Sequence, residues 1–209
     1  MSTADLDLVP LDGQLDGQLD GRRARRDRNK IAVVDAYLDL IREGNPRPSV
    51  AEVAERSGVS HRSVFRYFAD KDELARTSIE RQETVVTPML AIPIDASDSL
   101  GDRVDLVVRH RLELFETIAP VARLSRSLAP MQPILQSELT KARSFFRAQV
   151  KRAFAGELGR MDKSRAATTL AVVDVLCSFE VAELLRADQG LSLDRANEAL
   201  RDALLLILK

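Results

Sequence analysis

The sequence holds few of the side chains that build covalent crosslinks or reactive centres. It has a single cysteine, Cys177, so no disulfide can form within the chain, which fits a reducing compartment. It has only two histidines, His61 and His110. It also lacks a Cys/His cluster with metal-ligand spacing, a nucleophile elbow and a glycine-rich phosphate loop. We therefore expect no enzyme, no catalytic residue, no metal site and no cofactor.

Long apolar runs are missing as well. No apolar stretch reaches the ~18 residues that a membrane-spanning helix needs. The opening residues, MSTADLDLVP, are acidic where a secretory signal is basic. With 45% hydrophobic and 30% charged residues, the composition is that of an ordinary soluble globular protein. We expect a cytoplasmic protein with no membrane partner.

What the chain does have is an uneven distribution of charge. Its formal net charge is −1, yet residues 1–21 carry five aspartates and no basic residue. Residues 22–76 hold thirteen Lys and Arg against nine Asp and Glu, with five arginines in the run RRARRDR. Such a basic segment favours a polyanionic partner. The run is interpreted either as a solvated leader or as a flexible arm that follows the DNA phosphate backbone or reaches into a minor groove, with Arg25 and Arg26 as the predicted contacts.

Helical periodicity runs through nearly everything after Asp27, and no alternating strand pattern occurs. Residues 1–26, with the repeat LDGQLDGQLDG, are too poor in apolar side chains to form a core and are expected to be disordered. The fold class is predicted to be all-α with about nine helices, in two domains: a helix-turn-helix over 27–75 and a larger helical domain over 76–209. Beyond Pro93 the predicted helices cover roughly 99–118, 121–129, 133–156, 163–187 and 192–208.

The helix-turn-helix is predicted within VAEVAERSGVSHRSVFRYFADKDEL. Ser49 and Glu52 have the spacing of a capping box, and Gly58 can end that first short helix in a left-handed conformation. Ser60 can then cap a second helix over residues 61–67. The first turn of this second helix, which reads HRS, must be exposed, and its helix N-terminus and hydrogen-bonding side chains favour DNA.

This segment resembles the DNA-binding region of the TetR family of bacterial transcriptional regulators. The resemblance covers residues 28–80 closely, and the helical remainder matches the family in length and helix count. The family usually has tyrosine where this chain has Phe65, so apolar contact is expected there in place of a phosphate-directed hydroxyl. Arg47 and Arg66 either reach phosphate or lie in solvent, and Tyr67 either contacts the DNA backbone or only packs. The DNA-contacting residues are therefore predicted to be Arg47, Ser49, Ser60, His61, Arg62, Ser63, Phe65, Arg66, Tyr67 and Lys71.

A reading helix of this kind contacts one half-site, so a two-fold homodimer on a palindromic double-stranded operator is expected. Residues 166–185 are apolar nearly all round, and a helix without a polar face must be covered on two sides. In the TetR family the last two long helices form a four-helix bundle with their copies; the alternative is burial within one subunit. The predicted interface residues are Val173, Leu176, Leu184, Leu200, Leu204 and Ile207.

Arg111 lies near the centre of an apolar helix face, where a charged side chain needs an anion. The anion is either an internal carboxylate, Glu138 or Asp174, or an acidic ligand. Since the TetR family holds its inducer pocket among the middle helices, the candidate effector contacts are His110, Arg111, Phe115 and Phe146, although the aromatic pair can also be core. The sequence thus predicts a repressor released by an unidentified small-molecule effector; the alternative is a DNA-binding regulator or architectural protein without one.

Overall fold

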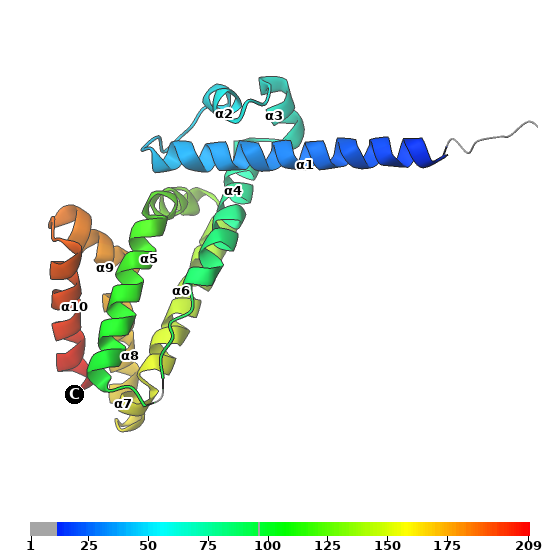
Figure 1. Ribbon diagram of the computed structural model, residues 1–209. Coiled ribbons are helices and arrows are strands. Elements are labelled where there is room, and N and C mark those ends of the chain that lie inside the picture. Colours follow the sequence, from blue (N-terminus) through cyan, green and yellow to red (C-terminus); the bar gives the residue numbers. More distant parts are fainter. Residues whose placement is uncertain (1–11, 96) are drawn as a thin grey trace, which may run out of the picture. The chain divides into compact units, whose positions relative to one another are not determined.

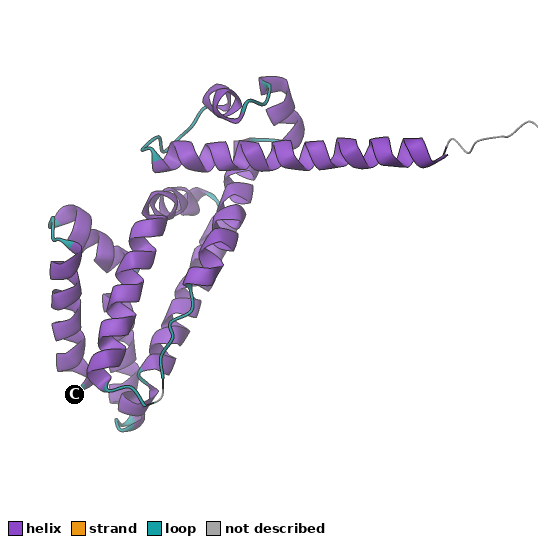
Figure 2. Ribbon diagram, viewed as in Figure 1, coloured by secondary structure: helices purple, strands orange, loops and turns teal. Residues whose placement is uncertain are grey.

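The computed structural model describes residues 12–95 and 97–209, and this part of the chain consists of helices, turns and loops without a strand (Figure 2). The all-α prediction is confirmed. None of the helices described is long and apolar enough to cross a membrane. The α-helices are α1 (Asp12–Arg42), α2 (Val50–Ser57), α3 (His61–Tyr67), α4 (Lys71–Val86), α5 (Leu100–Leu128), α6 (Pro133–Ala153), α7 (Ala155–Gly159), α8 (Lys163–Leu176), α9 (Phe179–Glu183) and α10 (Leu193–Leu208).

Internal contacts divide the chain into an N-terminal unit, Met1–Ser78, and a C-terminal unit, Ile79–Lys209. The division falls inside α4, close to the predicted domain boundary after residue 75. Short 3-10 turns, η1 (Thr87–Met89) and η2 (Ala129–Met131), follow α4 and α5, and a π-helical turn, η3 (Leu184–Asp188), follows α9.

Helix α1 is longer than the sequence suggests (Figure 1). The expected disorder over residues 1–26 is not met over 12–26, which are helical, while residues 1–11 lie outside the described part. Leucine, glutamine and arginine are good helix formers, and each residue added to an existing helix gains a hydrogen bond without a new nucleation step. Residues 21–28 are exposed, so backbone hydrogen bonding rather than packing holds this stretch of α1.

The second half of α1 packs against α2 and α3 to form the core of the N-terminal unit (Figure 1). Apolar side chains recur on one face of α1 at helical spacing, so that a single stripe is turned inward. The valines expected to join the two short helices, Val53, Val59 and Val64, are all buried. The other buried side chains of this core include Val34, Leu38, Ile41, Phe68 and Leu74.

The C-terminal unit is built around α5, which packs against α6 and α10, while α8 packs against the same two helices. Its core is aliphatic, with Val104, Val107, Leu112 and Leu204 almost fully buried. The polar link at one end of this core is an ion pair between Arg103 of α5 and Glu157 of α7.

Two helices depart from the predicted boundaries. Pro120, which the sequence predicts to separate two helices, lies inside α5. A proline within a helix removes one backbone hydrogen bond and bends the helix, and Figure 1 shows α5 changing direction toward its C-terminal end. The helix predicted over 163–187 is interrupted after Leu176, because the Ser178 hydroxyl accepts a hydrogen bond from the Val181 amide and starts α9.

Candidate functional site

The turn between α2 and α3 is fixed by local hydrogen bonds. The Glu52 amide donates to the Ser49 hydroxyl at 3.2 Å, and the Ser49 amide donates back to the Glu52 carboxylate at 2.7 Å. The predicted capping box is therefore present. Gly58 ends α2 with φ of 66°, a left-handed conformation that a residue with a Cβ adopts only at a cost. Ser60 then caps α3 by accepting from the Ser63 amide at 3.3 Å.

The first turn of α3 is open to solvent. His61 and Arg62 are exposed, Ser63 is half-buried, and among the described residues Arg62 makes no ion pair. The His61 ring packs edge-on against Phe65, with ring centroids 5.0 Å apart, and Phe65 is itself 55% exposed. An arginine without an acidic partner, beside an exposed ring, can meet a base edge or a phosphate without first breaking an internal contact.

The hydroxyl groups of the predicted serine contacts already take part in hydrogen bonds within the chain. The Ser60 hydroxyl lies 3.0 Å from the Ser63 hydroxyl, so the two groups are already hydrogen-bonded to each other. Ser49 accepts from a backbone amide, and its own hydroxyl proton remains available for a further acceptor. Of the three predicted serine contacts, Ser60 is therefore the one whose hydroxyl proton is engaged within the described chain, since it donates to Ser63, whereas the hydroxyl protons of Ser49 and Ser63 remain available.

The Tyr67 side chain is largely buried, with only 7% of its surface exposed. Its hydroxyl accepts from the Asn29 side-chain amide at 3.3 Å and from Arg66 at 3.5 Å. These hydrogen bonds, that of Asn29 first, lower the pKa of Tyr67. Sequence reasoning missed Asn29, whose polar side chain at the start of the packed half of α1 was the available signal.

The remaining predicted DNA contacts are exposed basic groups. Arg25 and Arg26 lie on α1, Arg47 lies in the turn before α2, and Lys71 is the first residue of α4. By contrast, Arg56 is neutralised, because its guanidinium donates to both oxygens of Glu43 at 2.7 Å. The N-terminal unit therefore presents basic side chains from α1, the turn before α2, α3 and α4.

The predicted dimer contacts need correction. Val173, Leu200 and Leu204 are buried in the core of their own subunit, and Leu176 and Ile207 are partly buried against it. Val173, Leu200 and Leu204 face inward, and helical periodicity alone does not distinguish an intrasubunit face from an intersubunit one, whereas Leu176 and Ile207 stay predictions. Of the six, Leu184 is exposed. The other strongly exposed apolar side chains of these late helices are Val172, Val175 and Leu206.

Arg111 is 1% exposed, but neither predicted carboxylate binds it. Its Nη2 donates to the Gln149 side-chain oxygen at 2.7 Å and to the Phe146 carbonyl at 3.3 Å. Asp174 accepts instead from Arg147 at 2.9 Å, and Glu138 from Lys141 at 2.7 Å. The expected internal carboxylate partner is therefore wrong. Sequence reasoning missed Gln149, a polar residue one turn after Phe146 on the inward side of α6.

Burial dominates the electrostatics at this position. It lowers the pKa of Arg111 to about 10, so the guanidinium still carries its charge at neutral pH. Burial also lowers the pKa of His110, and the neighbouring Arg111 charge adds to that effect. His110 Nδ1 and the Arg111 nitrogens Nε and Nη1 are buried without a hydrogen-bond partner among the described residues. A buried donor left unsatisfied destabilises by about 1–3 kcal/mol.

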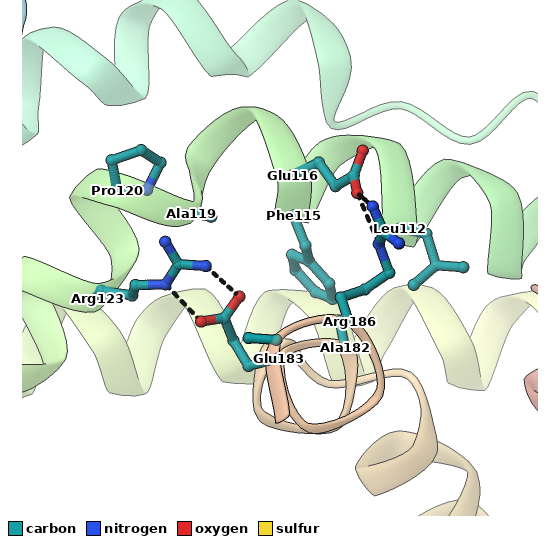
Figure 3. A pocket seen from close by; sticks show the side chains of 10 residues that line it. Leu112, Phe115, Glu116, Ala119, Pro120, Arg123, Ala182, Glu183 and Arg186 are labelled. Atoms are coloured by element: carbon teal, nitrogen blue, oxygen red, sulfur yellow. Dashed lines mark hydrogen bonds and ion pairs between the residues drawn. The ribbon is translucent and has the colours of Figure 1, made fainter. Parts of the chain in front are cut away.

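A separate cleft of about 440 Å³ lies between α5 and the α9–η3 segment (Figure 3). Phe115 lines it, whereas the other three effector candidates do not. Arg123 bonds to Glu183 at 2.5 Å, and Arg186 pairs with Glu116; both ion pairs belong to the cleft lining. Phe115 also packs edge-on against Phe146 at 5.7 Å, and the Arg111 guanidinium lies 4.2 Å from the Phe146 ring centroid. Arg111 and Phe146 are therefore in contact with each other, and Phe115, which touches Phe146 and lines the cleft, lies between this pair and the cleft.

The part of the chain that matches a known family model lies within the N-terminal unit. Residues 34–77 match the family model of the bacterial regulatory proteins of the tetR family. An HTH-type transcriptional repressor of Mycobacterium tuberculosis and an HTH-type transcriptional regulator of Mycobacterium bovis are each 32% identical over 90 residues. That stretch covers 42% of this chain and 48% of each relative, so the match spans about half the length of these curated proteins.

Solved structures share the fold over most of the chain. A transcriptional regulator from Rhodococcus sp. RHA1 is 21% identical, with a TM-score of 0.63 over 88% of this chain and 95% of that one. A TetR-like transcriptional regulator from the same organism is 16% identical, with a TM-score of 0.60 over 87% and 93%. The resemblance inferred from the helix-turn-helix sequence is thereby confirmed: residues 34–77 match the TetR family model, and the fold of the chain is similar to that of TetR-like regulators.

Proposed function

We propose that this chain is a transcriptional repressor that binds a palindromic DNA operator as a homodimer and is released by a small-molecule effector. The observation that carries the proposal is the exposed first turn of α3, where Arg62 has no ion pair among the described residues. A turn used only for internal packing would have no reason to leave an unpaired arginine at a helix N-terminus. The names of the Mycobacterium relatives support transcriptional control.

Dimerisation in this proposal uses the exposed apolar side chains of the late helices rather than the buried ones. Val172 and Val175 are three residues apart on α8, so they lie on one side of that helix. A second copy covering them would bring two reading helices onto one operator. An effector releases the DNA only if it binds one arrangement of the dimer better than the other.

The test of DNA reading is Arg62→Ala. The full chain is first used to select its operator from a random DNA pool, and the affinities of both proteins for that operator and for unrelated DNA are then measured. Arg62→Ala is expected to weaken operator binding by about 1–3 kcal/mol and to relax selectivity at the contacted base pair. Arg109→Ala, which removes an exposed arginine of α5, is the matched control and should leave binding unchanged. Undiminished selectivity in Arg62→Ala would rule out base reading by this side chain.

The arginines of the exposed stretch of α1 are tested by salt. Replacing all five between Arg22 and Arg28 with glutamine keeps a good helix former at each position but removes the charge. For every DNA phosphate that the variant no longer neutralises, the slope of log affinity against log salt concentration is expected to become shallower by about 0.9. A slope equal to that of the unmodified protein would assign these arginines to solvent.

A further inference from the structure

Arg111 is a buried charged residue of the C-terminal unit that lacks some of the hydrogen bonds its guanidinium could make. The side chain is 1% exposed, and its Nε and Nη1 have no hydrogen-bond partner among the described residues. The acids named above are already engaged, Asp174 by Arg147 and Glu138 by Lys141. Burial raises the pKa of the Cys177 thiol to about 12, so that neighbour contributes no negative charge. Asp174 acts on Arg111 only through space, where it offsets part of the effect of burial on the Arg111 pKa, and the guanidinium makes no hydrogen bond or ion pair with a carboxylate among the described residues.

We propose that Arg111 binds the carboxylate of a monocarboxylic effector with an apolar body. This assignment rests on the proposed function, because it names the chemistry of the molecule that releases the operator. The anionic group binds one of the two nitrogens that the chain leaves free, Nε or Nη1, which face opposite sides of the guanidinium, while Nη2 keeps its bonds to Gln149 and Phe146. Charge-assisted hydrogen bonds of this kind are the strong ones, and guanidinium geometry suits a planar carboxylate.

The surroundings decide the charge and the polarity of the ligand. The Phe146 ring lies beneath the guanidinium, and Phe115 packs on Phe146. The α5 positions one turn away, Val107, Val108 and Leu114, are aliphatic and buried, and His110 is the polar neighbour of Arg111 on this helix. One buried positive charge balances one negative charge, so a dianion would bring a second charge with no partner. The rest of the ligand meets aromatic and aliphatic surface, which favours hydrocarbon.

Gln149 joins this position to the segment that follows α4. While its side-chain oxygen accepts from Arg111, its side-chain amide donates to the Leu90 carbonyl at 2.5 Å. Residues 90–95 lack regular helix, and Leu90, Ile92 and Ile94 pack partly buried against the core. Irregular segments of this kind open at lower free energy than helices. Gln149 is thereby joined by a hydrogen bond to the residue that directly follows α4 and η1.

The experiment compares straight-chain carboxylates of four to twelve carbons with the corresponding neutral amides, all below micelle-forming concentrations, by thermal unfolding of the full chain. At least one carboxylate is expected to raise Tm by roughly 5–10 °C at a hundredfold excess over its Kd, and its amide is expected to raise it far less. Equal shifts from every carboxylate and its amide would overturn the assignment. Inorganic phosphate serves as a further probe, and a shift matching that of the best carboxylate would also overturn it.

Variants assign the effect to the residue. In Arg111→Met the preference for carboxylate over amide is expected to vanish, and Arg195→Met, which removes an exposed paired arginine of α10, should retain it. If Arg111→Met does not fold, Arg111→Lys keeps the charge and should keep a weakened preference; a preference lost there, or kept in folded Arg111→Met, contradicts the proposal. Operator binding by the ligand-free protein is measured separately. Failure to bind DNA would reject the repressor, whereas normal DNA binding without a carboxylate preference would reject only the role of Arg111.

Discussion

Glu157→Ala is expected to destabilise the C-terminal unit by about 3–5 kcal/mol, as measured by denaturant unfolding. Glu157 is 5% exposed, and its two oxygens accept from Arg103 at 2.7 and 2.9 Å. Arg103 also donates to the Ala153 carbonyl at 2.6 Å, so the pair fastens the start of α5 to the end of α6. Without the carboxylate, a largely buried guanidinium loses its counter-ion. Removing one partner of a buried ion pair destabilises more than replacing both partners by apolar side chains, because it leaves an uncompensated buried charge.

The matching double variant separates the pair from its surroundings. Arg103→Met with Glu157→Leu replaces both charges by apolar side chains, and it should be more stable than Glu157→Ala alone. Glu198→Ala breaks an exposed pair with Arg195 and should change stability by less than about 1 kcal/mol. A single variant no less stable than this control would mean that the Arg103 charge is hydrated in the folded chain.

Acid provides an independent check on the same pair. Hydrogen bonds from Arg103 hold the pKa of Glu157 below its ordinary value of 4.5, against an opposing effect of burial. A carboxyl with a depressed pKa in the folded state contributes stability that is present above the ordinary value. That contribution is lost as pH falls through the folded-state pKa. The unfolding free energy of the unmodified protein should therefore decline below about pH 4.5, and that of Glu157→Ala should decline less.

Val175→Asp is expected to convert the proposed dimer to monomers in sedimentation equilibrium. Val175 is 60% exposed in one subunit, so the substitution should leave the fold of that subunit intact. In a two-fold interface the aspartate appears twice, and each buried carboxylate without a partner opposes association by about 3–5 kcal/mol. Operator affinity should fall with dimerisation, because a monomer reaches only one half-site.

Met131→Asp is the matched control, since Met131 is also an exposed apolar residue, 67% accessible, but lies in η2 rather than in the late helices. It should remain dimeric. If Val175→Asp stays dimeric at the same protein concentrations, the α8 face takes no part in association, and another surface must hold the copies together.

The helix-turn-helix could be predicted from sequence because its determinants are local. Ser49 with Glu52, Gly58, and Ser60 each act on backbone within four residues, so spacing alone specifies the turn. The valines that join the helices follow from the same spacing. Exposure of Arg62 then follows from which side of a very short helix those valines occupy.

Features that depend on long-range packing could not be predicted in the same way. The partner of Arg111 is Gln149, 38 residues away, and no local pattern favours this amide over Asp174. The inward faces of α8 and α10 look the same in sequence whether the neighbour is α5 or another subunit, so periodicity assigns Val173 and Leu204 to the wrong surface. In the sequence Pro120 resembles a helix end, because proline has a very low helix propensity. The helical pattern continues on both sides of it, however, and α5 runs through this residue.

Because α1 continues without a break from Asp12 to Arg42, its arginines have a fixed azimuth relative to the packed face that carries Val34 and Leu38. An α-helix turns about 100° and rises about 1.5 Å for each residue. One residue inserted after Lys30 would swing the whole arginine row a quarter turn or more around the axis. Seven residues inserted there, nearly two full turns, would restore its direction and carry it about 10 Å farther out. The number of residues between the arginines and the packed face of α1 therefore sets the direction in which the arginines point. In sequences that differ here by a single residue, the same charges would face different sides of a bound duplex.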